Sequence, residues 1–118
     1  MNIRIFISMQ ALNRLAKDKY IQKNKKAYNQ EILMIAQSLS KRPSEMIGKF
    51  HVSPRGRKDF RIAWHFEYDE KTDIVSIYID DLLYHERGLK YVDDWTEKVR
   101  IGEINLSSYS RYSVWEVL

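Results

Sequence analysis

Three histidines and one arginine are the side chains best suited to proton transfer and to charge stabilisation. Imidazole titrates nearest neutral pH, so His51, His65 and His85 can serve as general acids or bases. The Arg61 guanidinium stays charged and can grip two oxygens of a phosphate at once. Arg61 and His65 lie on one face if residues 60–68 form a strand, because an even spacing keeps side chains on the same side. Together these residues suit acid–base chemistry at a phosphate.

The same residues also have a purely structural interpretation. His65 could be a polar side chain on the solvent side of a half-buried strand. Arg61 could be a surface cation paired with Glu67 or Asp59. The sequence leaves both interpretations open.

Positive charge is concentrated in the first half of the chain. Residues 1–58 carry 13 basic and 3 acidic side chains, whereas residues 59–118 carry 7 and 13. A basic half of this density can neutralise phosphates or dock on an acidic protein, and it can also be a solvated helix face with a charged loop. The side chains that would attract RNA in this half are Lys23, Lys25, Lys26, Arg55, Arg57 and Lys58.

Composition excludes several classes of site. The chain has no cysteine, so it has no disulfide framework, thiolate nucleophile or cysteine-based metal site. Its three histidines are too scattered for an all-histidine metal site, and we expect no metal and no cofactor. Neither a membrane-spanning run nor a signal peptide is evident, so we expect a cytoplasmic protein without a membrane partner.

Hydrophobic periodicity predicts a single α+β domain over residues 1–118. Residues 2–8 alternate as a strand, and two helical stripes, within 9–27 and 28–39, predict a hairpin that turns at Asn24 or Asn29. We expect Ser8 to cap the first helix. Strands are then predicted at 47–52, 60–68 and 74–83, which gives an antiparallel meander with the helices packed on one face. The expected helical core residues are Leu12, Leu15, Ile32, Ile35 and Leu39.

The C-terminal third is less regular. Residues 95–104 fit either a short helix or a strand, and residues 106–118 fit either a closing strand or a docked tail. Trp64 shares the apolar face of the 60–68 strand, so we expect it in the core rather than stacked on a base.

Over residues 1–86, the pattern of small residues and of the spacing between them resembles that of the RelE/ParE superfamily of bacterial toxins. The resemblance lies in Phe6-x4-Ala11-Leu12-x2-Leu15, in Leu39-x3-Pro43, and in Asp59-Phe60-Arg61-Ile62 leading into the segment 74–79. Residues 87–118 extend beyond the family's usual end. Members that cleave mRNA on the ribosome need no metal or cofactor and act through basic side chains on the sheet. Members of the ParE branch target gyrase instead.

The resemblance implies roles for further residues. Arg61 takes the place of the arginine that faces the scissile phosphate. Lys49 and His51 fall where the family often has two lysines. Tyr84, His85 and Arg87 supply the side-chain types that follow the family's central strand. Asp80 and Asp81 depart from the pattern, since carboxylates at this place would repel a phosphate.

Two functions follow as expectations. The first is a toxin-type endoribonuclease that cleaves mRNA, free or on the ribosome, by attack of the 2′-hydroxyl on its adjacent phosphorus. The implied partner is a small acidic antitoxin. The alternative is a non-catalytic binding module of the same fold that engages a gyrase-like target, an antitoxin or nucleic acid.

Overall fold

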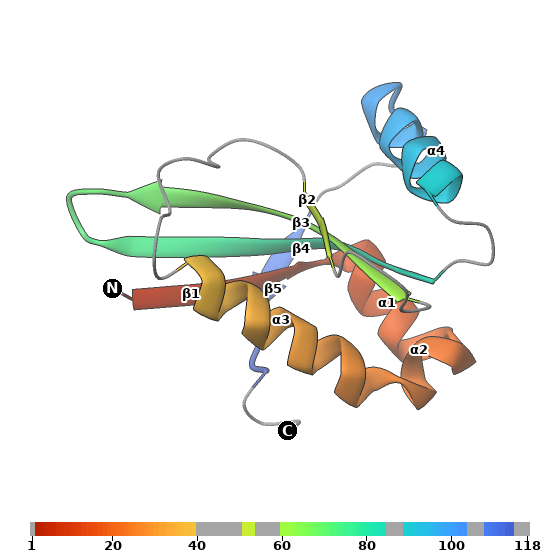
Figure 1. The fold of residues 1–118 in the computed structure, drawn as a ribbon, viewed down its shortest axis with the longest axis horizontal. Coiled ribbons are helices and arrows are strands. Elements are labelled where there is room, and N and C mark those ends of the chain that lie inside the picture. Colours follow the sequence, from red (N-terminus) through yellow and green to blue (C-terminus); the bar gives the residue numbers. More distant parts are fainter. Residues whose placement is uncertain (1, 40–50, 54–59, 85–88, 104–107, 115–118) are drawn as a thin grey trace.

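A mixed five-stranded sheet organises the part of the chain that the computed structural model describes, residues 2–39, 51–53, 60–84, 89–103 and 108–114. Figure 1 shows α3 and α4 on opposite sides of this sheet. In chain order the elements are β1 (Asn2–Ser8), α1 (Met9–Lys17), α2 (Lys19–Lys23), α3 (Lys25–Leu39), β2 (His51–Ser53), β3 (Phe60–Asp69), β4 (Ile74–Tyr84), α4 (Leu89–Arg100) and β5 (Tyr109–Arg111).

The strands lie in the order β2-β3-β4-β1-β5. β2, β3 and β4 pair antiparallel, β1 pairs parallel with β4, and β5 pairs antiparallel with β1. The α+β class is therefore confirmed, but a sheet formed only by an antiparallel meander is wrong. β4 is apolar on both faces along much of its length, and such a strand needs neighbours on both edges, which β3 and β1 supply.

The N-terminal helical region contains three helices rather than the expected two. Ser8 caps α1 as predicted, because its hydroxyl accepts a 3.0 Å hydrogen bond from the Ala11 N–H. Asp18 adopts an extended conformation that ends α1, and its carboxylate caps α2 by accepting from the Ile21 N–H at 3.2 Å. Asn24 separates α2 from α3, whereas Asn29 is buried inside α3. A single capping aspartate thus divides the first predicted helix.

The core lies between α3 and one face of the sheet, here called the core face, which carries Ile62, Trp64, Phe66 and Ile77. Ile32, Ile35 and Leu39 are buried in this core as expected, and so is Trp64. Leu15 is only partly buried, and the placement of Leu12 in the core is wrong, since it is 37% exposed. α1 instead buries Ala11, and successive helix positions are rotated by about 100°, which turns Leu12 outward.

The opposite face of the sheet, here called the second face, is covered in part by α4. Trp95 of α4 packs on Ala63 of β3 and Leu83 of β4, with Val99 beside them. Residues 95–100 are therefore helical, and the final segment forms a short closing strand, β5. No helix among the described residues is long and apolar enough to cross a membrane.

Candidate acid–base site on the second face

A β-bulge in β4 turns two consecutive carboxylates toward the second face. Ala63 pairs with Asp81 and Trp64 pairs with Ile79, so Asp80 has no residue opposite it. Bulges re-aim side chains in this way. Both carboxylates are buried, with 0% of each residue exposed. Buried carboxylates need hydrogen-bond donors, and Asp80 and Asp81 accept hydrogen bonds from different parts of the structure.

Asp80 is paired with His65 across the β3–β4 ladder. The His65 Nδ1 lies 2.7 Å from the Asp80 Oδ2, and the His65 side chain is 25% exposed. The imidazole stacks on Tyr78 with ring centroids 4.8 Å apart. A carboxylate that accepts from Nδ1–H fixes the tautomer whose proton-accepting lone pair is on Nε2. Asp80 thereby orients the histidine for proton transfer.

Two further elements hold Asp80 in place. The Tyr109 hydroxyl, brought by β5, donates to the other oxygen of the Asp80 carboxylate. Ser8, between β1 and α1, donates its hydroxyl to the Asp80 backbone carbonyl at 2.7 Å. Burial, and then the hydrogen bond to Asp80, raise the pKa of Tyr109, so Tyr109 stays protonated as a donor. β1, β4 and β5 therefore converge on the residue that orients His65.

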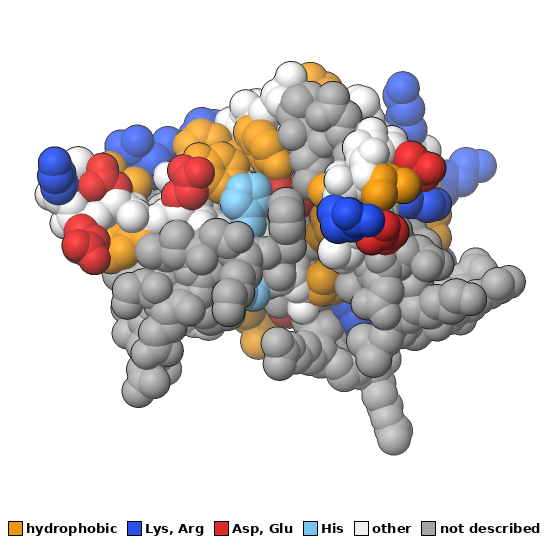
Figure 2. Space-filling view, turned by 90° about the horizontal axis from the view of Figure 1, so that it is seen from above, with side chains coloured by type: hydrophobic (Ala, Val, Ile, Leu, Met, Phe, Trp, Pro, Cys, Tyr) orange, Lys and Arg blue, Asp and Glu red, His pale blue; other side chains and the backbone are white. Residues whose placement is uncertain are grey.

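A row of flat side chains crosses the second face at the level of His65. His65, Tyr78, Phe6 and Arg111 occupy one register position on β3, β4, β1 and β5. Tyr78 and Phe6 stack with centroids 5.3 Å apart, and the Arg111 guanidinium lies 5.6 Å from the centre of the Phe6 ring. In the view from above, Figure 2 shows a histidine beside hydrophobic side chains, with acidic side chains toward the left end of the molecule.

Asp81, in contrast, contacts side chains that hold helices against the sheet. Its Oδ1 lies 2.7 Å from the Arg14 Nε, and its Oδ2 accepts from Gln10 Nε2 and Trp95 Nε1, each at 2.8 Å. The Leu82 N–H also donates to this carboxylate. Burial raises the pKa of Asp81, and the Arg14 charge and the two side-chain donors offset part of that effect. Asp81 thus links α1 and α4 to β4, and its charge is paired with that of Arg14.

Comparison with known proteins found no matching family model, no matching curated protein and no matching solved structure.

Arg61 lies on the same face as His65, as the even spacing predicts, but at a distance. Four residues of strand separate them by about 13 Å, at about 3.3 Å per residue. Trp95 covers Ala63 in between, and Arg61 donates from Nη1 to the Phe60 carbonyl at 2.7 Å. Arg61 and His65 therefore share a surface but do not converge on one phosphate group.

Two other predicted site residues are on the core face. His51 pairs with Trp64 and stacks on its ring, with centroids 4.5 Å apart. Tyr84 packs on Tyr20 and donates its hydroxyl to the Asp18 Oδ2 at 2.7 Å. The structure thus separates His51 and Tyr84 from His65.

The Tyr84 hydrogen bond leads to a prediction about acid stability. This bond is the main cause that lowers the pKa of Asp18 below its usual 3.8, against the opposing effect of burial. A lowered pKa stabilises the fold fully above the unfolded-state value, and the effect is lost as the pH falls through the folded-state value. We expect Tyr84→Phe to lower the free energy of unfolding by about 1 kcal/mol at pH 7, since Asp18 is only half-buried.

Urea denaturation of both proteins between pH 2 and pH 7 measures this difference. It should persist down to about pH 4, near the unfolded pKa, and disappear in stronger acid. A difference that stays constant down to pH 2 would show that the ionised Asp18 carboxylate is not involved.

Some of the remaining predicted residues are exposed, and the others lie outside the residues that the structure describes. Lys23, Lys25 and Lys26 are exposed around the junction of α2 and α3, where they can attract phosphates. The other positions lie outside the described residues: Lys49, His85 and Arg87 from the site, and Arg55, Arg57 and Lys58 from the RNA-binding set.

Sequence reasoning missed the carboxylate and the tyrosine that hold His65. The sequence predicts only that Asp80 would repel a phosphate, and it leaves the segment of Tyr109 open between a closing strand and a docked tail. The available signal was an Asp-Asp pair within an otherwise apolar strand, because buried carboxylates are rare unless they are paired. Among the described residues, no group of three or more histidines and carboxylates could hold a metal ion.

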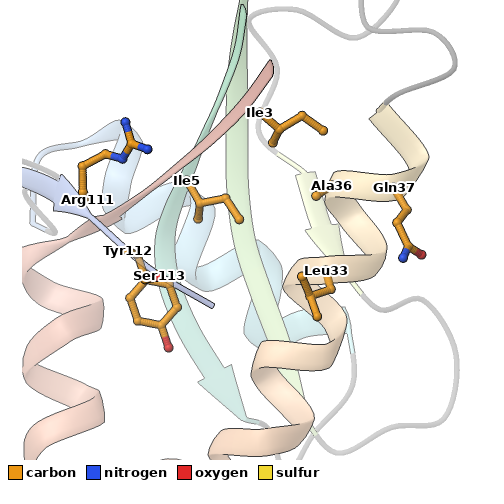
Figure 3. A pocket seen from close by; sticks show the side chains of 8 residues that line it. All are labelled: Ile3, Ile5, Leu33, Ala36, Gln37, Arg111, Tyr112 and Ser113. Carbon is orange, nitrogen blue, oxygen red and sulfur yellow. The ribbon is translucent and has the colours of Figure 1, made fainter. Parts of the chain in front are cut away.

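A cavity of about 350 Å³ lies between α3, β1, the last residue of β5, Arg111, and the two residues that follow it. Its wall is largely apolar, with Ile3, Ile5, Leu33 and Ala36 from the strand and the helix (Figure 3). Because it contains no acid–base pair, it is not a second candidate for proton-transfer chemistry.

Proposed function

We propose that this protein is a cytoplasmic, toxin-type endoribonuclease of the RelE/ParE kind that cleaves mRNA, free or on the ribosome. In this proposal the N-terminal helices pack together mainly on the core face of the sheet, although Gln10 and Arg14 of α1 reach Asp81, and the chemistry takes place on the second face. The substrate is RNA, no metal takes part, and a small acidic antitoxin is the expected partner.

One observation carries the proposal: a buried carboxylate, Asp80, orients a partly exposed imidazole, His65, at 2.7 Å. A structural histidine on the solvent side of a strand has no need of a wholly buried carboxylate. An acid–base group does, since the carboxylate fixes its tautomer and stabilises the imidazolium when it forms. Such positioned groups accelerate proton-coupled steps by about 10²- to 10⁴-fold.

The reaction follows from this pair. His65 takes the proton of a 2′-hydroxyl, and the 2′-oxygen then attacks the adjacent phosphorus. The bond from phosphorus to the 5′-oxygen of the next nucleotide breaks, and that oxygen leaves as a hydroxyl by taking back, from the His65 imidazolium, the proton that His65 removed from the 2′-hydroxyl. The products are a 2′,3′-cyclic phosphate and a 5′-hydroxyl end. Asp80 stabilises the positive charge that His65 holds during the step.

Arg61 acts at a neighbouring nucleotide in this proposal. At about 13 Å along the strand from His65, its guanidinium is placed for another phosphate of the same RNA rather than for the scissile one. Lys23, Lys25 and Lys26 add attraction that does not depend on sequence.

Cleavage in the presence of a chelator tests the proposal. We expect purified protein to cut mRNA at the same rate with and without excess EDTA, and its induced expression to arrest bacterial growth with cut transcripts. If EDTA abolishes cleavage by the purified protein, the metal-free mechanism is wrong.

A binding module of the same fold is the second candidate. The observation in its favour is the separation of Arg61 from His65, with Trp95 over the strand between them. If the purified protein neither cuts RNA nor arrests growth, while it binds a gyrase-like target or an antitoxin, this second function replaces the first.

A further inference from the structure

Two arginines lie on the second face at the β1–β5 edge of the sheet, whereas His65 is on β3. Arg4 of β1 and Arg111 of β5 are both exposed, and neither strand contains an acidic residue. The carboxylates of the sheet are on β3 and β4. Among the described residues, no carboxylate forms an ion pair with either arginine.

Arg111 is oriented for binding by the aromatic row beside it. Its side chain points away from α3 (Figure 3), and its guanidinium lies over the Phe6 ring at 5.6 Å. A guanidinium held over a ring by a cation–π contact still presents its N–H groups to the two oxygens of a phosphate. The contact with Phe6 therefore limits the freedom that Arg111 would lose on binding an anion.

We infer that Arg111, with Arg4 beside it, forms a phosphate-binding site for single-stranded RNA that crosses the sheet toward His65. The inference rests on the proposed function, because it names the path of that RNA. Arg111 and His65 occupy the ends of one row, three strand spacings or about 14 Å apart. Between Arg111 and His65 the RNA thus runs at right angles to the strands, and beyond His65 it turns along β3 toward Arg61. Its scissile phosphate lies at His65, and another phosphate of the same RNA lies at Arg111.

The middle of the row favours unpaired bases. Phe6, Tyr78 and His65 stack on one another, so they present ring edges rather than ring faces away from the sheet. The positive edges of aromatic rings attract the faces of other aromatic rings. Bases that are free of pairing partners can lie flat over these edges, whereas the faces of paired bases are covered inside a helix.

Binding of 2′-O-methylated RNA tests the inference without cleavage, because this RNA lacks the attacking hydroxyl. The probe is a labelled oligonucleotide of about 12 nucleotides, within the range that single-strand sites cover. Fluorescence anisotropy over a series of salt concentrations gives its Kd and the salt slope. For Arg111→Ala we expect Kd to rise about 10-fold and the slope to fall by about 0.7, the loss of one phosphate contact.

The matched control is Arg100→Ala. Arg100 is also an exposed arginine, but Glu97 already neutralises it through two hydrogen bonds, so the Kd and the salt slope should stay unchanged. Arg111→Lys should recover part of the affinity, since it keeps the charge and loses the planar fork.

The outcomes separate this inference from the proposed function. If the parent binds the probe and Arg111→Ala binds it with the same Kd and slope, the inference is overturned while the cleavage proposal stands. It is equally overturned if the parent binds an acidic peptide but not the probe. If binding depends on Arg111 and unmodified RNA is still not cut, the phosphate site stands and the cleavage proposal fails.

Discussion

Replacing His65 by asparagine should reduce RNA cleavage by about 10²- to 10⁴-fold, the contribution of a positioned acid–base group. Asparagine keeps a polar side chain beside Asp80, but it cannot exchange a proton near neutral pH. Because the asparagine amide can donate to Asp80 in place of the His65 Nδ1–H, the protein should stay folded, with its melting temperature lowered by a few degrees through the lost stacking on Tyr78. Initial rates of cleavage of one labelled RNA by both proteins measure the effect.

His51→Asn is the matched control for this experiment. His51 is on the same sheet but on the core face, stacked on Trp64. Its substitution should leave the cleavage rate of the folded protein within about 2-fold of the parent, since His51 lies on the face of the sheet opposite His65 and its lost stacking on Trp64 affects stability rather than the site. An active His65→Asn variant, or an equal loss in both variants, would remove His65 from the chemistry.

Replacing Asp81 by alanine should destabilise the fold by about 2–3 kcal/mol, since it removes a wholly buried carboxylate that accepts several hydrogen bonds, although its partner Arg14 is 33% exposed. Arg14 would keep a charge next to a buried space, and the Trp95 and Gln10 donors would lose their acceptor. The free energy of unfolding from urea denaturation measures the loss. Many domains have a total stability of only about 5–15 kcal/mol, so the variant should lose a large part of it.

Glu70→Ala is the control, since it removes an exposed carboxylate from the β3–β4 turn and should change stability by less than about 0.5 kcal/mol. A second substitution, Arg14→Met, should recover part of the loss in Asp81→Ala because it removes the unpaired charge. If Asp81→Ala and Glu70→Ala have the same free energy of unfolding, the contacts of Asp81 with Arg14, Gln10 and Trp95 do not determine stability.

Much of the fold is predictable from periodicity alone. The alternation of residues 2–8 and 60–68 has one regular period, and both segments are strands with nearly the predicted bounds. The division of the first helix is harder to predict, because Asp18 is compatible with a helix surface and acts as a cap only when its backbone becomes extended. The parallel pairing of β1 with β4 depends on tertiary packing, which a local pattern does not contain.

The site is less predictable than the fold. Arg61 and His65 share a face because their spacing within one strand decides it. His51 and Tyr84 belong to other strands, so their faces depend on register, and both pair with core-face residues, Trp64 and Phe60.

The bulge at Asp80 shifts the register by one residue, and the alternation of apolar and polar residues does not predict such a shift. Tyr109 reaches Asp80 only because β5 returns to the edge of the sheet beside β1. Both features come from long-range pairing, which sequence spacing does not specify.

The central claim is that the second face cleaves RNA through the 2′-hydroxyl, and the chemical ends of the fragments test it most directly. Purified protein is incubated with a defined mRNA in excess EDTA, and the fragments are analysed by mass spectrometry. We predict upstream fragments that end in a 2′,3′-cyclic phosphate and downstream fragments that begin with a 5′-hydroxyl. Fragments with 3′-hydroxyl and 5′-phosphate ends, or an RNA that stays intact, would contradict the account.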